Sequence, residues 1–211
     1  SYTPVKDQDG NVIKVIKIAS DVTNMVAARI QGENIQSAVD SGWAYIEFEP
    51  DGTIVSANEN FLSTMGFKSE AEIKGQHHQI FCDATYSATA EYKKFWQDLG
   101  SGIAQNGEYL RVRKDNKQVW LQAAYTPVRD ETGAISKVIK IATDISEVKF
   151  PVLAVSKIIG DMAQGDLTQK FNVAAEGYVQ EMGDALNIAM ENLNALLSTI
   201  GKNADFVGNS S

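Results

Sequence analysis

The chain has 211 residues, 44% of them apolar, and a formal net charge of −8. This length allows one or two small domains, and the negative charge argues against nucleic acid or an anionic membrane surface as the main partner. The single Cys82 excludes an internal disulfide framework, as is usual in the cytoplasm. No apolar run approaches the ~20 residues of a membrane span. We therefore expect a cytoplasmic protein without membrane contact.

The first residues of the chain repeat a later segment. Tyr-Thr-Pro-Val occurs at 2–5 and again at 125–128, and 13 of the 24 residues in 2–25 are identical to their counterparts in 125–148. A repeat at one domain length is typical of tandem copies of one module. Residues 1–23 are therefore expected to be the last two strands of a truncated upstream copy. The alternative is an N-terminal hairpin that belongs to the sheet of the following domain.

Residues 24–42 favour a linking helix. Val26 and Ile30, and then Ile35, Ala38 and Val39, fall at spacings of three and four residues, and Gly42 is a helix-stop signal. A coiled-coil stalk and a helix folded over a sheet would both explain this pattern.

The central segment, residues 43–148, has the pattern of one antiparallel sheet with helices across one face, an α+β fold. Its strand-like runs are rich in aromatic and β-branched residues and are separated by polar turns. They lie at Ala44–Phe48, Thr53–Ser56, Glu108–Val128 (two strands) and Ile135–Ala142. Helix-like sequence fills the interval from Asn60 to Leu99. The clearest helix is predicted over Ser87–Leu99.

One face of this predicted helix is apolar, with Tyr92, Phe95, Trp96 and Leu99 at spacings of three and four. We expect that face to pack on the strand residues Trp120, Ala124, Ile139 and Ile141. Such a stripe is usually core, and a ligand cleft between helix and sheet is the alternative.

Two amphipathic helices are predicted after Ser146. Apolar residues step by three and four at Val152, Val155, Ile159 and Met162, and again at Val179, Met182, Leu186, Ala189, Leu193, Leu196 and Ile200. Two such helices with a connector cannot bury both apolar seams alone, which predicts a bundle with a second chain.

The central segment resembles the PAS sensory domains of bacterial chemoreceptors. The matching stretches include Asp51–Leu62, Met65–Phe67, Gly75–Phe81, Phe95–Leu99, Arg113–Trp120 and the terminal Asp144-Ile-Ser146. The resemblance implies a five-stranded PAS domain over 43–148, with residues 1–23 ending an upstream PAS domain. It also implies that Asp144 and Ser146 couple the sensor to its output.

Residues 149–200 resemble a HAMP signal-relay module, an α-helical coiled-coil segment. Pro151 matches the leading proline of that family, Gly165-Asp-Leu its connector, and Glu181 the start of its second helix. These residues are the expected signal-coupling positions. Residues 201–211 are expected to begin a following helix.

Reactive groups are scarce in this sequence, so we expect no enzyme activity and no metal site. His77 and His78 are adjacent and point about 100° apart on a helix, whereas a zinc site needs three or four ligands.

The resemblance leaves the cofactor unknown. Flavin-binding chemoreceptor domains carry a tryptophan where Trp96 stands, which makes FAD one candidate. Haem would have to use His77, His78 or Cys82, in a departure from the haem-binding groups of the family. An empty pocket or a small molecule is the alternative. The residues that would contact a cofactor are Trp96, His77, His78, Asn60 and Trp120.

The resemblance therefore implies a sensory and relay region of a dimeric chemoreceptor. Its partners would be a second copy, through the helical segments, and a downstream signalling domain with its kinase and adaptor complex. Competing interpretations are a PAS module that only dimerises, and the sensor region of another signalling protein such as a histidine kinase.

Overall fold

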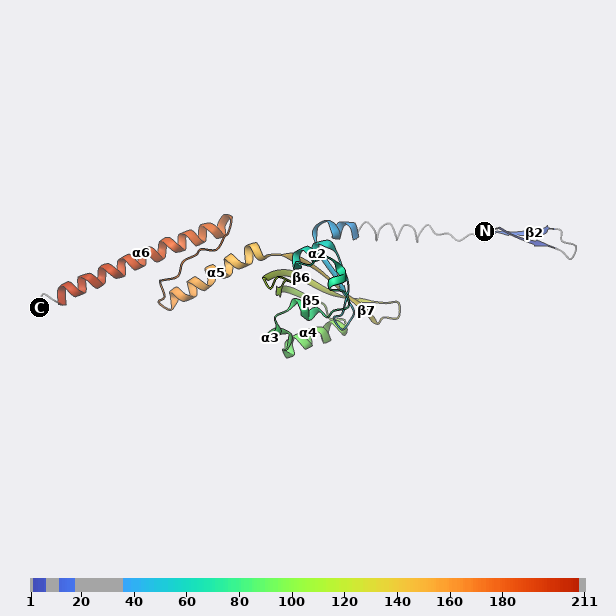
Figure 1. Cartoon of the computed structure of the whole chain (residues 1–211), viewed down its shortest axis with the longest axis horizontal. Coiled ribbons are helices and arrows are strands. Elements are labelled where there is room, and N and C mark those ends of the chain that lie inside the picture. The colour runs from blue at the N-terminus through green and yellow to red at the C-terminus, as the bar shows by residue number, and fades with distance from the viewer. Residues whose placement is uncertain (1, 7–11, 18–35, 209–211) are drawn as a thin grey trace. The chain divides into compact units, whose positions relative to one another are not determined.

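The computed structural model describes residues 2–6, 12–17 and 36–208, with side chains described from 36 to 205 (Figure 1). The chain divides into two compact units, Ser1–Gly42 and Trp43–Ser211. Most of the predicted linker helix over 24–42 lies outside the described residues, and residues 36–42 are helical.

The first unit contains two antiparallel strands, β1 (Tyr2–Lys6) and β2 (Val12–Lys17). Tyr2 pairs with Lys17, and the register becomes irregular after Val5. The counterparts of these residues, 123 positions later, pair in the same way, and the same irregularity recurs there. The repeat in the sequence is thus also a repeat of strand register.

The second unit begins with a five-stranded antiparallel sheet in the order β4-β3-β7-β6-β5. This confirms the predicted sheet. Its strands are β3 (Ala44–Phe48), β4 (Ile54–Ala57), β5 (Gln105–Val112), β6 (Gln118–Arg129) and β7 (Ile135–Asp144).

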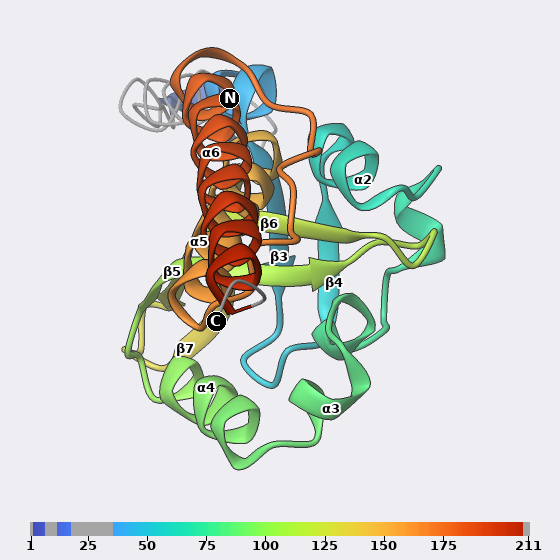
Figure 2. The same cartoon turned by 90° about the vertical axis from the view of Figure 1, so that its left-hand side faces the viewer.

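Short helices lie on one face of this sheet (Figure 2). They are α2 (Glu59–Met65), η1 (Glu70–Glu72), η2 (His78–Phe81), α3 (Ala84–Ser87) and α4 (Ala90–Gly100). The helix predicted over Ser87–Leu99 begins three residues later than expected. Thr89 is the N-cap of α4, because its hydroxyl oxygen accepts the backbone N–H of Tyr92 over 3.1 Å.

The apolar stripe of α4 is buried as predicted, but the face of the sheet that it meets is the opposite one. Strands β6 and β7 bury Val119, Leu121, Ala123, Tyr125, Val138, Lys140 and Ala142. The residues predicted to face the helix, Trp120, Ala124, Ile139 and Ile141, are half-buried on the other face. The prediction was wrong because it placed the isoleucines inward, whereas a buried lysine sits between them.

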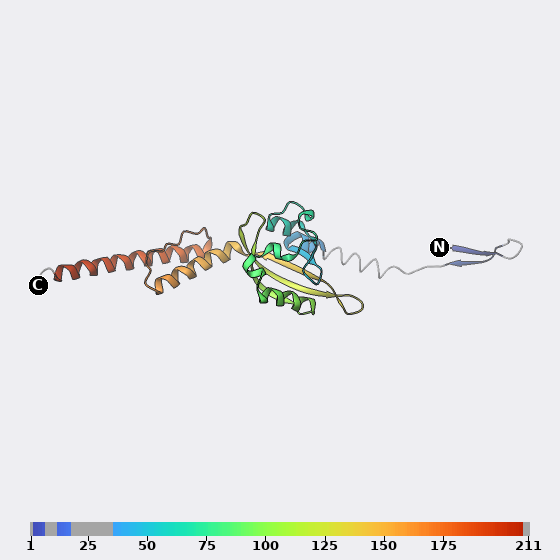
Figure 3. The same ribbon diagram turned by 60° about the horizontal axis from the view of Figure 1, so that its bottom comes forward.

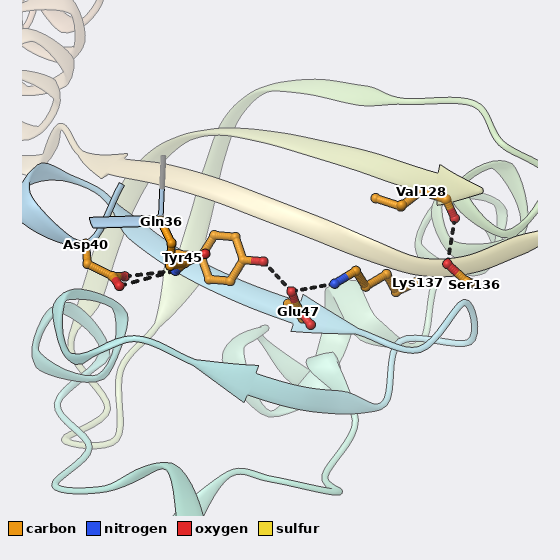
Figure 4. Close-up of polar contacts among 7 residues, drawn as sticks. All are labelled: Gln36, Asp40, Tyr45, Glu47, Val128, Ser136 and Lys137. Atoms are coloured by element: carbon orange, nitrogen blue, oxygen red, sulfur yellow. Dashed lines mark hydrogen bonds and ion pairs between the residues drawn. The ribbon is translucent and has the colours of Figure 1, made fainter. Parts of the chain in front are cut away.

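Polar contacts also link neighbouring strands of the sheet (Figure 4). The carboxylate of Glu47 on β3 accepts hydrogen bonds from the hydroxyl of Tyr45 and from Nζ of Lys137 on β7, the latter over 2.8 Å. The hydroxyl of Ser136 on β7 donates to the carbonyl of Val128 on β6 over 3.2 Å. These contacts fix the register of β7 against both neighbours.

Two longer helices follow the sheet, α5 (Ser146–Ala163) and α6 (Gly177–Gly208), and they lie side by side (Figure 3). The predicted pair of helices is confirmed, but α6 continues across residue 200, where a boundary was expected. None of the helices in the described part of the chain has the length and apolar character that a membrane span requires.

The apolar contacts between α5, the connector and α6 centre on Val155, Ile158, Phe171 and Met190. Several residues of the predicted seam are exposed within this chain, namely Val152, Ile159, Met182, Leu196 and Ile200. The face of α6 that the connector covers is therefore rotated from the predicted seam. It contains Gly183, which is buried against Phe171.

Candidate ligand-binding site

A fully buried histidine lies at the centre of the helix–sheet interface. His78 is the first residue of η2, and both of its ring nitrogens have tyrosine partners. Nδ1 lies 3.0 Å from the hydroxyl of Tyr92 on α4, and Nε2 lies 3.0 Å from the hydroxyl of Tyr125 on β6. Cys82 approaches from one turn later, with Sγ 3.7 Å from Nδ1. Both histidine nitrogens are therefore satisfied by the protein.

Two buried cations flank this histidine. Arg111 on β5 donates from Nη2 to the hydroxyl of Tyr125 over 3.4 Å, and Nζ of Lys140 on β7 lies 4.9 Å from the centre of the same tyrosine ring. Arg111 and Lys140 are 2% and 1% exposed. A polar row thus crosses the core from β5 through Tyr125 and His78 to Tyr92.

Burial and positive charge shift the pKa values of this group. Burial lowers the pKa of His78 well below its ordinary value, and the charges of Arg111 and Lys140 lower it further. Burial, and then the charge of Arg111, lowers the pKa of Lys140 well below its ordinary value. Burial raises the pKa of Cys82. The imidazole is therefore neutral at neutral pH, and the thiol is protonated.

A cavity opens beside this group at the β5 edge of the sheet. It has a volume of about 380 Å³. Its apolar and cationic lining includes Tyr86, Tyr109, Arg111 and Trp120, and its acidic lining consists of Asp83, Glu91 and Glu108. This volume lies within the usual range for small-molecule sites, ~300–1,000 Å³.

The residues predicted to contact a cofactor are only partly brought together. Trp96 and His78 are buried neighbours, with ring centroids 5.3 Å apart, and the ring centroid of His77 lies 5.8 Å from that of Trp96. Asn60 is elsewhere, on α2, where its amide donates to the carbonyl of Trp43. Trp120 lies on the outer face of the sheet and lines the cavity at the β5 edge.

Sequence reasoning missed the polar members of the site, Arg111, Lys140 and Tyr125. Charged residues in strands are usually exposed, so the sequence pattern does not indicate an arginine or a lysine in the core. The alternation in β6 could have found Tyr125. Val119, Leu121 and Ala123 lead by steps of two to Tyr125, which pairs with Lys140.

The junction between sheet and helix joins the predicted coupling residues. Oδ1 of Asp144 accepts the backbone N–H of Ser146 over 2.8 Å, and the hydroxyl oxygen of Ser146 accepts the backbone N–H of Trp120 over 2.9 Å. The backbone N–H of Ile145 donates to the carbonyl of Trp120 over 2.9 Å. The start of α5 is therefore attached to β6.

The remaining predicted coupling residues lie in the two helices and the connector. Pro151 is buried within α5, Gly165 follows α5 with a left-handed φ of 89°, and Glu181 is exposed on α6. Asp166 holds the connector turn by accepting the backbone N–H and hydroxyl of Thr168. These contacts, that of the Thr168 hydroxyl first, lower the pKa of Asp166 to about 2.

Comparison with known proteins identifies the central segment. A family model described as a PAS domain matches residues 44–147. This segment is a PAS domain. The biofilm dispersion protein BdlA of Pseudomonas aeruginosa is 37% identical over 147 residues, which are 70% of this chain and 35% of that protein. The chain thus spans about a third of that relative's length.

Solved structures resemble the PAS domain at the level of the fold. A PAS domain from Colwellia psychrerythraea, known from a crystal structure, is 18% identical, with a TM-score of 0.47. The matched region is 55% of this chain and 97% of that domain's chain. A light-oxygen-voltage domain studied with a flavin analogue is 18% identical, with a TM-score of 0.45. The matched region is 69% of this chain and 99% of that domain's chain.

The centre of this PAS domain is filled by aromatic side chains, and this arrangement does not fit a flavin ring system. The ring of His78 lies within 5.3–6.3 Å of those of Phe48, Trp96, Phe95 and Tyr125, measured between centroids. Binding of FAD between α4 and the sheet would require these packed, buried rings to move.

Neither histidine of the PAS domain has a ring nitrogen free to ligate haem. Nε2 of His77 lies 2.8 Å from the carbonyl oxygen of Asp51, and its Nδ1 accepts the backbone N–H of Gln79. Gly52 allows this packing, since a Cβ at its φ of 95° would lie 2.6 Å from Nε2 of His77. Among the described residues, no three histidine, cysteine or acidic side chains are grouped to hold a metal ion.

Proposed function

We propose that this chain is the sensory and relay region of a dimeric, cytoplasmic bacterial chemoreceptor. Its PAS domain would sense a small ligand or a redox state and would pass the change to the helices that follow. The continuity of β7 carries this proposal. Lys140 belongs to the buried polar group, Asp144 ends the same strand four residues later, and α5 begins at Ser146.

A displacement of Lys140 or its neighbours would therefore reach the junction through a single strand. The contacts of Ser146 and Ile145 with Trp120 give the start of α5 a second attachment, on β6. A ligand that favours one position of β7 relative to β6 would shift the population of α5 orientations. This requires only that the ligand bind one of the two states more tightly.

The helices α5 and α6 would act as a HAMP-like relay. Support comes from the two helices themselves, from the glycine turn at Gly165, and from the connector that packs along α6. The exposed apolar residues of α6 would pair with those of a second copy. A downstream signalling domain and its kinase and adaptor complex would receive the output.

The register shared by β1–β2 and β6–β7 supports a tandem arrangement of two PAS domains. Residues 1–23 would then end the upstream domain, and residues 24–42 would occupy the same place after it that α5 occupies after the second.

Spin labels on α6 would test the relay. Ser198→Cys in a Cys82→Ala background places one label on each copy, and pulsed electron spin resonance measures the distance between the two labels. We expect the distance distribution to change between reduced and oxidised protein, or on addition of a ligand that raises the melting temperature. An unchanged distribution under both stimuli would refute the relay.

The absorbance spectrum of the purified chain tests the redox version of this function. A flavin gives a characteristic band in the blue and haem gives a Soret band. The packed core predicts colourless protein, in which the stimulus is a ligand and not a redox cofactor. A flavin band that Trp96→Ala removes with the fold retained would establish FAD and an opened core.

The same packed core favours a second candidate function, a PAS domain that only dimerises or spaces its neighbours. It would also dimerise through α6, but its label distances would be insensitive to every stimulus. The spin-label experiment therefore separates the two.

A further inference from the structure

Two buried cations in the PAS domain lack an acidic partner. The ion pairs within residues 36–205 all join other side chains, so neither Arg111 nor Lys140 has a carboxylate at salt-bridge distance there. Both side chains are more than nine-tenths buried. Removing a charge from water without a partner is costly. A guanidinium cannot relieve this cost by losing its proton. A bound anion would therefore stabilise the buried charge of Arg111 in particular.

The hydrogen bonds of Arg111 leave one edge of the guanidinium unused. Nη1 donates to the carbonyl of Leu110 over 2.9 Å, and Nη2 makes the long contact with Tyr125. Nε is buried and has no hydrogen-bond partner. The side of a guanidinium that carries Nε–H and a neighbouring N–H matches the two oxygens of a carboxylate.

The unsatisfied guanidinium belongs to the cavity at the β5 edge. Arg111 lines that cavity, and its Cζ lies 4.9 Å from the ring centre of Tyr109 and 5.8 Å from that of Tyr86. Both tyrosines line the cavity as well, together with Trp120. Trp120 lies on the outer face of the sheet, so a ligand beside Arg111 would meet one cation and two tyrosine rings.

The rim of the cavity limits the charge that a ligand can carry. Glu108 is paired with Lys149, and Asp83 caps α3, which leaves Glu91 as a further carboxylate on the lining. A phosphate or a dicarboxylate would place its additional negative charge among these groups. A single carboxylate attached to an apolar body avoids this repulsion.

We propose that the cavity binds a small aromatic monocarboxylate, whose carboxylate pairs with the Nε–H edge of Arg111 while its ring packs on Tyr86 and Tyr109. This proposal rests on the sensory function proposed above and names its ligand class. It also connects ligand to output, because Arg111 contacts Tyr125, which pairs with Lys140 on β7.

Titration calorimetry of the whole 211-residue chain tests the ligand class. The probes are benzoate, phenylacetate and indole-3-acetate, each compared with its neutral amide. A charge-assisted pair that the amide cannot make predicts at least ~10-fold tighter binding of one or more carboxylates. The proposal fails if no carboxylate binds at millimolar concentration, or if each amide binds as tightly as its acid.

Substitution of the arginine tests the site. Arg111→Gln should weaken binding of the best carboxylate at least ~10-fold and leave binding of the amide unchanged. Arg129→Gln, which removes an exposed arginine from β6, is the matched control and should bind as the parent chain does. Unchanged carboxylate affinity in a folded Arg111→Gln variant would overturn the assignment.

Crystallography covers the case in which Arg111→Gln does not fold. The parent chain crystallised with 4-bromobenzoate should show the anomalous signal of bromine between Tyr86 and Tyr109. Bromine at another position, or none at a saturating concentration, would refute the site.

The two proposals fail in different ways. Carboxylate binding without any change in the spin-label distance would keep the ligand site and refute the relay. A label distance that responds to redox state, in a chain that binds no carboxylate, would keep the sensor and refute the ligand class.

Discussion

The hydroxyl oxygen of Ser146 accepts the backbone N–H of Trp120 over a distance of 2.9 Å. The first residue of α5 is therefore hydrogen-bonded to a residue near the start of β6. Asp144 reinforces the same turn by accepting the backbone N–H of Ser146. The sheet and the exit helix thus share a small set of polar contacts, whose removal can be measured one at a time.

Asp144→Ala should lower the free energy of unfolding by about 0.5–2 kcal/mol, because it removes a side-chain acceptor at the start of a helix. It should also abolish the ligand-dependent change in the spin-label distance while calorimetric ligand affinity is retained. Chemical denaturation would measure the stability, pulsed electron spin resonance the label distance, and calorimetry the ligand affinity.

Asp144→Asn is the control for this junction, since an amide oxygen at the same position can still accept the N–H of Ser146. It should restore most of the stability and the response. A normal response in Asp144→Ala, with only the stability lowered, would mean that Asp144 is a cap and that the signal leaves by another route.

The stability of the PAS domain should fall as the pH drops through the ordinary range of histidine. The unfolded chain takes up a proton near pH 6.5, whereas burial holds the pKa of His78 in the folded chain well below that value. Folding then loses up to about 1.4 kcal/mol per pH unit between pH 6.5 and the folded pKa. Urea denaturation at pH 7.5, 6.5 and 5.5 would show this as a falling midpoint.

His78→Gln should flatten that dependence, because glutamine does not titrate and can still bond to Tyr92 and Tyr125. His77→Gln changes the adjacent histidine and should keep the dependence of the parent chain. Equal slopes in the parent and His78→Gln would show that another group is responsible.

Leu196→Asp combined with Ile200→Asp should convert the proposed dimer to a monomer. These side chains are 60% and 62% exposed within the chain, so the substitution leaves its own packing intact. In a dimer seam the two carboxylates would be buried without partners, which costs several kcal/mol. Sedimentation equilibrium would give the molar mass.

Asn192→Asp with Ser198→Asp adds the same two charges off the predicted seam and should leave the dimer in place. If the seam variant remains dimeric, association takes place elsewhere, for example through residues 24–42.

Asn187→Ala should release the connector from α6. The side chain of Asn187 accepts the backbone N–H of Phe171 over 2.8 Å and donates to its carbonyl over 3.0 Å. Loss of both bonds should cost about 1–3 kcal/mol and expose the peptide bond after Lys170 to trypsin. The rate of limited proteolysis would measure this.

Asn194→Ala is a milder comparison, because Asn194 makes a single bond to the connector, from its amide to the carbonyl of Leu167 over 2.8 Å. Cleavage after Lys170 should be faster in Asn187→Ala than in Asn194→Ala. Equal rates in both variants and the parent would show that apolar packing alone holds the connector.

The order of elements and the stripe of α4 could be predicted because local pattern determines them. Phe95 and Leu99 repeat at helical spacing, and the strands carry aromatic and β-branched residues between polar turns. Which side chains of β6 and β7 point toward the helices could not be predicted from hydrophobicity, because hydrophobicity favours isoleucine in the core. Ile139 and Ile141 point outward because Lys140 is paired with the inward-facing Tyr125.

The candidate site was only half accessible to prediction for the same reason. His78 and Trp96 stood out as rare residue types, and both are buried in the core. Arg111 and Lys140 acquire their significance only when the strands are paired, since nothing in their local sequence distinguishes them from exposed charges. The face of α6 that the connector covers through Phe171 could not be predicted, because helical periodicity alone does not identify it.

The contact between Gly183 and Phe171 limits how α6 can move against the connector. A Cβ on Gly183 would lie 2.1 Å from Cδ1 of Phe171, so the aromatic ring sits directly on the backbone of α6. Rotation of α6 beneath a stationary connector would drive the side chains on either side of Gly183 into that ring. If α6 turns in the proposed relay, the connector should therefore turn with it, and a larger residue at position 183 should separate the ring of Phe171 from the backbone of α6.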